Sequence, residues 1–247
     1  MPQQFPQSKT IKLAISAIFT SLVFAATVVF YSYVPQTTGF FNIGETMVYT
    51  TAILFGPLVG AFAGGVGSML ADLFLGYSHF APATLIIKGC EGAIVGLLSR
   101  KKLIFKSKNQ WKVFTLIAGL VAGLLLAGVG SIYYSGSVEL YIGIPPPQIP
   151  NFVLSVPPVF WYGLGALVTL FTVLMGFVFD PEFGWLVFTI IVGGLVMVAG
   201  YFLYEQFFLG VAALGEIPLN IGQMSIGLII AIPLVRAVRR YLPSLRT

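Results

Sequence analysis

The chain has 247 residues, of which 57% are hydrophobic and only 9% are charged, and its formal net charge is +5. A mean hydropathy of +0.96 excludes a soluble globular domain, because so apolar a surface would not tolerate water. The positive charge therefore does not indicate nucleic-acid binding, and we expect the basic residues to face the anionic inner leaflet of a membrane. The single cysteine, Cys90, excludes an intrachain disulfide.

Long apolar segments recur along the chain, and most are about long enough to cross a bilayer. The first runs over 11–33 and lacks a cleavage site, so we interpret it as a membrane helix and not as a cleavable signal peptide. The stretch 43–75 is ambiguous, because Pro57 after Gly56 could break one long tilted helix into two short ones. The remaining candidates are 82–99, 113–133, 159–178, 185–208 and 217–235.

The basic residues decide how many times the chain crosses. Twelve of the thirteen fall into three short clusters, and such clusters stay on the cytoplasmic side of a membrane. The clusters are Lys9 with Lys12, residues 100–112 and residues 236–246. The first two share a side only if an even number of crossings separates them, so the stretch 43–75 must cross twice. The sequence therefore predicts an all-α, polytopic bundle of eight helices in the cell membrane, with both termini cytoplasmic.

The predicted helix at 43–56 is unusually short for a membrane helix. At about 1.5 Å per residue it spans roughly 20 Å, less than the roughly 30 Å of hydrocarbon, so we expect it to be buried among neighbouring helices. Short or interrupted helices often mark the ligand site of a transporter. Small residues at four-residue spacing predict close helix contacts in the segments around this short helix. They form two series, Gly56, Gly60, Gly64 and Ser68, and Gly92 and Gly96.

Polar residues on five of the predicted helices fall at one depth, in the outer half of the membrane or at its rim. Within each helix they recur at intervals of three, four or seven residues and so share one face. We interpret this pattern as one polar pocket that opens to the exterior. The residues are Asn42, Glu45 and Tyr49; Ser68 and Asp72; Lys88 and Glu91; Tyr201, Tyr204 and Glu205; and Glu216, Asn220 and Gln223.

Lys88 is the thirteenth basic residue and lies inside an apolar segment, where a cation costs roughly 2.5–3.5 kcal/mol on insertion scales. Two roles are open for it: contact with a ligand, or a structural ion pair with Asp72 or Glu91. Any single polar residue of the set could also be an ordinary interfacial residue near a helix end. Lys88 and Glu91 lie one to two turns inside their helix, which is too deep for that explanation.

Two blocks of the chain resemble a known family. Residues 40–98 read FFNIGETMVYTTAILFGPLVGAFAGGVGSMLADLFLGYSHFAPATLIIKGCEGAIVGLL, and residues 215–234 read GEIPLNIGQMSIGLIIAIPL. They resemble the substrate-binding S components of energy-coupling factor (ECF) vitamin transporters, in particular the riboflavin-type family. This resemblance implies a six-helix core within a single transmembrane domain, formed by 1–110 and 183–247.

The resemblance leaves residues 111–182 as an added helical pair, because family members usually have six helices. The outer loop of this pair contains Pro145, Pro146 and Pro147, which favour a stiff polyproline II segment. Nothing in the pair resembles a chemical motif, and it could either pad the rim of the pocket or cap it.

The resemblance also implies partners and a site. A coupling transmembrane subunit and two ATPase subunits would energise uptake, in agreement with the lack of a Walker A sequence in this chain. The coupling subunit would dock on the first helix at Ala17, Ser21 and Ala25, where Ser21 departs from the AxxxA pattern. To the residues that the resemblance implies we add Glu45 from the polar set. The expected substrate-binding residues are then Phe41, Asn42, Glu45, Tyr77, His79, Lys88, Glu91, Tyr201, Glu205 and Asn220.

The implied substrate is a vitamin or a related micronutrient, with a riboflavin-like heterocycle first among the candidates. Aromatic residues at the mouth of the pocket could stack on a flat ring, namely Phe40, Phe41, Tyr77 and Phe80.

Two other functions remain open, a solitary carrier without ATPase partners and an intramembrane enzyme that uses His79, Lys88 and Glu91 or Ser68. The sequence has neither an HExxH motif nor a GxSxG elbow. We therefore expect that the protein is not an enzyme and has no catalytic residue, no metal and no cofactor.

Overall fold

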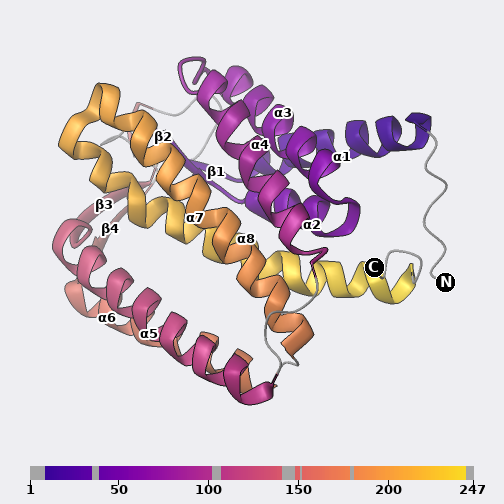
Figure 1. Cartoon of the computed structure of the whole chain (residues 1–247). Coiled ribbons are helices and arrows are strands. Elements are labelled where there is room, and N and C mark those ends of the chain that lie inside the picture. Colours follow the sequence, from indigo (N-terminus) through magenta and orange to yellow (C-terminus); the bar gives the residue numbers. More distant parts are fainter. Residues whose placement is uncertain are drawn as a thin grey trace. The chain divides into compact units, whose positions relative to one another are not determined.

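The computed structural model describes residues 9–34, 39–101, 107–140, 148–150, 152–178 and 181–242. These residues form eight α-helices, two β-hairpins and one short 3-10 helix (Figure 1). Seven of the described helices are long and apolar enough to cross a membrane, which confirms the predicted polytopic helical bundle. Pro145, Pro146 and Pro147 of the expected stiff loop lie outside the described residues.

The chain divides into two compact units, Met1–Lys101 with Val187–Thr247 and Lys102–Leu186. The elements of the first unit are α1 (Lys9–Val29), β1 (Tyr31–Val34), β2 (Gly39–Asn42), α2 (Glu45–Phe55), α3 (Pro57–Leu75), α4 (Ala81–Leu98), most of α7 (Pro181–Leu209), the 3-10 helix η1 (Gly210–Gly215) and α8 (Glu216–Tyr241). Those of the second unit are α5 (Lys108–Tyr133), β3 (Gly136–Leu140), β4 (Phe152–Val156), α6 (Pro158–Val178) and the start of α7.

Helix α2 is buried on nearly all sides, as its length requires. It has 11 residues, and between Glu45 and Leu54 every residue except Met47 is buried. Its neighbours are α1, α3, α4 and α8 (Figure 1). Because α2 ends at Phe55 and α3 begins at Pro57, the stretch that was ambiguous in the sequence forms two helices.

Two arginines reach the C-terminal end of α2, Arg100 from the turn after α4 and Arg239 from α8. Nη2 of Arg100 donates to the carbonyl of Phe55 at 2.9 Å, and Nη2 of Arg239 donates to the carbonyl of Ile53 at 3.4 Å. The last carbonyls of a helix have no partner within it and carry partial negative charge. These cations therefore stabilise the end of a helix that stops short.

We expect Gly56→Ala to lower the free energy of unfolding by about 1–3 kcal/mol. Gly56 has a φ of 85° and a ψ of −171°, a region that is essentially restricted to glycine, and an added Cβ would overlap the Arg100 guanidinium. Thermal unfolding in detergent would detect a lower Tm. Gly128→Ala in α5 is the control, because a Cβ there meets nothing within 4 Å. A Tm equal to that of the parent would contradict this role for Gly56.

Helices α3 and α4 approach each other closely along the predicted glycine ridges. A Cβ on Gly60 would lie 2.8 Å from the carbonyl oxygen of Gly92, and one on Gly64 would lie 2.9 Å from the carbonyl oxygen of Lys88. Real Cβ contacts are longer than this, so only glycine fits at both positions. The ridges thus confirm the prediction and bring the backbone at Lys88 against α3.

In the second unit, α5 and α6 pack on each other and are joined by the hairpin β3–β4. The two strands are antiparallel and pair from Gly136 with Val156 to Leu140 with Phe152. Small residues again form the helix contact, and the hydroxyl of Thr169 in α6 donates to the carbonyl of Gly119 in α5 at 3.0 Å. This is the packing that is typical of helices in lipid.

Candidate substrate-binding site

A polar cavity lies within the first unit, among β2 and helices α1, α3, α4, α7 and α8. It contains about 500 Å³ of empty space, which includes the part that is open to solvent. Among the ten residues that were expected to bind substrate, five line this cavity: Asn42, Lys88, Tyr201, Glu205 and Asn220.

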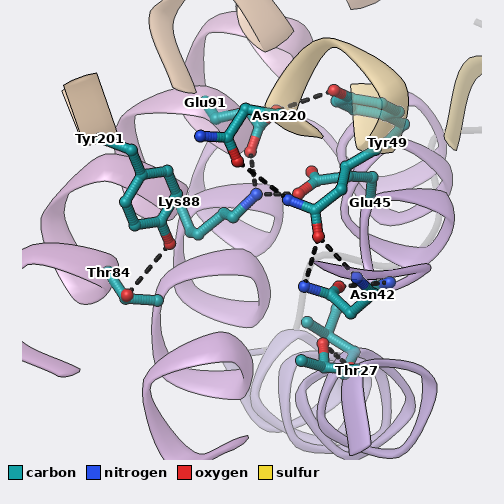
Figure 2. A network of polar contacts seen from close by, with 12 residues as sticks. Thr27, Asn42, Glu45, Tyr49, Thr84, Lys88, Glu91, Tyr201 and Asn220 are labelled. Carbon is teal, nitrogen blue, oxygen red and sulfur yellow. Dashed lines mark hydrogen bonds and ion pairs between the residues drawn. The ribbon is translucent and has the colours of Figure 1, made fainter. Parts of the chain in front are cut away.

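Lys88 lies at the centre of a buried network that joins α2 to α4 (Figure 2). Its Nζ forms an ion pair with Glu45 and donates to Oε2 of Glu91 at 3.2 Å. Oε1 of Glu91 also accepts a hydrogen bond from the hydroxyl of Tyr49 at 2.8 Å. Lys88 is 4% exposed, Glu45 1% and Glu91 0%, so the two carboxylates compensate a cation that water does not reach.

The partners of Lys88 differ in part from those expected. The sequence left Asp72 and Glu91 as alternatives; the structure has Glu91 together with Glu45 of the short helix. Glu45 and Glu91 thus lie beside the cavity and hold Lys88 in its wall. This arrangement gives Lys88 a structural ion pair, and its presence in the cavity lining leaves a second role in ligand contact open.

A second network joins the hairpin β1–β2 to α8 through Gln223. The side-chain oxygen of Gln223 accepts from the backbone nitrogen and from Nδ2 of Asn42, both at 2.7 Å. Its Nε2 donates to Oδ1 of Asn220 at 3.0 Å. Gln223 therefore fixes the orientation of both amides. It was recognised as polar in the sequence, but nothing there indicated that it positions two expected site residues.

Aromatic rings contribute to the remaining wall. The Tyr201 hydroxyl donates to the hydroxyl of Thr84 at 3.0 Å, and Nζ of Lys88 lies 5.6 Å from the Tyr201 ring centroid. Phe40 and Phe80 line the cavity as well. Behind Phe40 packs Tyr77, with the ring centroids 4.7 Å apart.

Phe41, Tyr77 and His79 do not line the cavity, although they were expected to contact substrate. Along β2 successive side chains point to opposite faces of the strand. Because Phe40 and Asn42 line the cavity, Phe41 between them points away from it. His79 is exposed, and its ring packs against Phe80 with centroids 4.6 Å apart. Geometry thus assigns Phe41 and His79 to the surroundings of the site.

Tyr77 is buried in the loop between α3 and α4 and supports the cavity wall from behind. Burial raises the pKa of Tyr77 above its ordinary value, and the nearby Tyr31, Tyr33 and Asp72 act in the same direction. The phenol is therefore neutral at physiological pH. A charged tyrosinate has no part in this site.

The other lining residues were not among the ten expected ones. Ser68, Asp72, Glu216 and Gln223 belong to the polar stripes of the sequence, so periodicity could have placed them. Threonines gave no such signal, because a threonine hydroxyl can bond to its own helix, as Thr27 does to the carbonyl of Val23 at 2.9 Å. The full set is Thr27, Gly39, Phe40, Ser68, Asp72, Phe80, Thr84, Glu216 and Gln223.

No group of three or more His, Cys, Asp or Glu within the described part of the chain has a geometry that could hold a metal ion. The chemistry that the cavity offers is hydrogen bonding by carboxylates, amides and hydroxyls, together with contact to aromatic rings.

Residues 7–157 match the family model described as ECF-type riboflavin transporter, S component. The chain belongs to this family. The match spans more than half of the sequence and contains the whole Lys88 network. It also extends through α5 and the second hairpin, into the segment expected to be added to the family's core.

Curated relatives agree with the S-component family. An uncharacterized protein from Pyrococcus woesei is 43% identical over 103 residues, which are 41% of this chain and 66% of that protein, just under two thirds of its length. The thiamine precursor transporter HmpT of Lactococcus lactis subsp. cremoris is 32% identical over 147 residues, 58% of this chain and 82% of that protein. A UPF0397 protein of Streptococcus pneumoniae is 33% identical over 81 residues, 32% of this chain and 43% of that protein. Together with the family match, the Lactococcus relative supports vitamin-type uptake.

Proposed function

We propose that this chain is the membrane-embedded, substrate-binding subunit of an ECF-type transporter and captures a vitamin or related micronutrient from outside the cell. The observation that carries the proposal is the cavity, where polar groups from five helices and one strand converge beside aromatic rings. Mostly apolar hollows with a few convergent polar groups are typical of small-ligand sites. Family membership supplies the class of substrate, and the cavity supplies a place for it.

The proposed orientation has both termini cytoplasmic and the cavity open to the exterior. Asp72 lies near the end of α3 and Asn220 near the start of α8, whereas Arg100 and Arg239 lie at the other ends of α4 and α8. Because basic residues stay on the cytoplasmic side, this distribution supports an outward-facing cavity.

The proposed ligand is a flat, vitamin-sized heterocycle, riboflavin-like as the description of the family suggests. The Lactococcus relative is a thiamine precursor transporter, which adds a thiamine precursor as a second candidate. Phe40 and Phe80 in the wall favour a planar ring in either case.

Mass spectrometry of small molecules released from the protein, purified in mild detergent, tests the proposal. We expect a heterocyclic vitamin or precursor, together with uptake that requires a co-expressed ATPase module. Uptake without any such module would favour a solitary carrier, and turnover of a lipid or peptide by the purified protein would favour an enzyme. Failure to bind any vitamin would contradict the proposal.

We further propose that a coupling transmembrane subunit, which in turn binds two ATPase subunits, docks on α1. Ala17, Ser21 and Ala25 are exposed on this helix. Their small side chains would allow a partner helix to approach closely.

We expect Ser21→Trp to reduce co-purification of the coupling subunit by about tenfold or more, because the large ring keeps the two helices apart. Ligand binding should stay at the parent level. Leu203→Trp is the control, since Leu203 is also exposed but lies on α7 and not on the small-residue stripe of α1. Equal losses in both variants would argue against this docking surface.

A further inference from the structure

The cavity contains more carboxylates than it has cations to pair with them. Among the described lining residues Lys88 is the only cation, and it is already paired with Glu45 and Glu91. Three further carboxylates line the same cavity, namely Asp72, Glu205 and Glu216. The wall therefore has more acidic side chains than basic ones even after Lys88 is counted.

All three of these carboxylates are buried, and Asp72 and Glu205 each have an oxygen without a hydrogen-bond partner among the described residues. Asp72 is 4% exposed and Glu205 is 3% exposed. Oδ2 of Asp72 and Oε2 of Glu205 have no hydrogen-bond partner among the described residues. A buried carboxylate oxygen without a donor is costly, so a donor that arrives with the ligand would be bound strongly.

The unpartnered groups line the same cavity as Tyr201 of α7. Tyr201 and Glu205 lie four residues apart on α7 and so share one face of that helix. The Tyr201 hydroxyl itself is engaged, since it donates to Thr84. Asp72 and Glu205 thus line one cavity, and the ion pairs given for its described cation, Lys88, are with Glu45 and Glu91.

We propose that the ligand is a flat nitrogen heterocycle that carries an amino group or a positive charge, which it presents to Asp72 and Glu205, and that phosphorylated forms are rejected. The inference rests on the proposed function and narrows its substrate class. Opposite charges attract strongly in a poorly solvated site, and an anion would meet several carboxylates there. The rings of Phe40 and Phe80 are compatible with a cationic heterocycle, because aromatic faces attract cations.

Calorimetry on the full chain in detergent, with four probes, tests this inference. The probes are thiamine, which is a cation with an amino group, riboflavin, which is uncharged, and the monophosphate ester of each. We expect thiamine to bind about tenfold or more tightly than riboflavin, because hydrogen bonds to charged groups are among the stronger ones, and the esters not to bind.

Two near-isosteric variants test whether the carboxylates cause the preference for thiamine over riboflavin. Asp72→Asn and Glu205→Gln should each weaken thiamine binding by about tenfold, and by a larger factor than they weaken riboflavin binding. Glu139→Gln, in β3 of the second unit, is the control, and the Tm of each variant checks that it folds. If riboflavin binds more tightly and the variants do not discriminate, the inference is wrong while the proposed function stands. If none of the four probes binds, the inference is wrong, and mass spectrometry of the molecules released from the protein then decides the proposed function separately.

Discussion

Replacing Lys88 with alanine is expected to weaken ligand binding by about a hundredfold or more while the protein still inserts into the membrane. Lys88 lines the cavity, and its ammonium group holds Glu45 and Glu91 together. Removal of one partner from a buried ion pair costs about 3–5 kcal/mol, because the remaining charge is left without compensation. Calorimetry measures the affinity, and size-exclusion chromatography of the detergent-solubilised protein reports insertion and folding.

A second variant separates the two roles of Lys88. Lys88→Met combined with Glu45→Gln removes one cation and one carboxylate, so we expect it to recover much of the Tm that Lys88→Ala loses. The affinity should not recover, since the cavity still lacks the donor that Lys88 offers to an acceptor atom of the heterocycle. If Lys88→Ala keeps its affinity within about twofold of the parent, the role of Lys88 is purely structural.

Gly60→Leu is expected to prevent folding altogether. A Cβ at this position would already lie 2.8 Å from the Ala52 Cα and 2.8 Å from the Gly92 carbonyl oxygen, and both are backbone atoms that cannot rotate away. A leucine would force α3 away from α2 and α4, and tight packing is what drives helix association in lipid. The yield of monodisperse protein in detergent is the readout.

Gly89→Ala provides the matched control on the facing helix. Its Cβ would come no closer than 3.6 Å to the carbonyl oxygen of Ala61, an ordinary contact. We expect this variant to fold like the parent. Normal yield for Gly60→Leu would mean that the helices can separate at little cost, and the ridge would then have no structural role.

Much of the fold could be predicted from the sequence because membrane helices are defined by local properties. The apolar runs gave the spans, and Pro57 after Gly56 gave the break between α2 and α3. The length of α2 alone required burial, which the structure confirms. Small residues at four-residue spacing likewise predicted where α3 and α4 touch.

The candidate site was predictable only in part. Periodicity shows which residues share a helix face, and so Lys88 and Glu91 were expected together. It does not show which residue of another helix will meet that face, and Glu45 was not recognised as the second partner. In β2, where side chains alternate, a shift of one residue reverses the face, and Phe40 lines the cavity instead of Phe41.

The order of residues along the chain by itself determined the apolar spans, the short second helix and the presence of a cation at membrane depth, since each depends on neighbours a few positions away. Tertiary structure alone decided that Gln223 orients Asn42 and Asn220 and that Asp72 and Glu205 face one cavity with unpartnered oxygens. Those contacts join segments far apart in sequence. Their geometry follows from how whole helices pack, which no local pattern encodes.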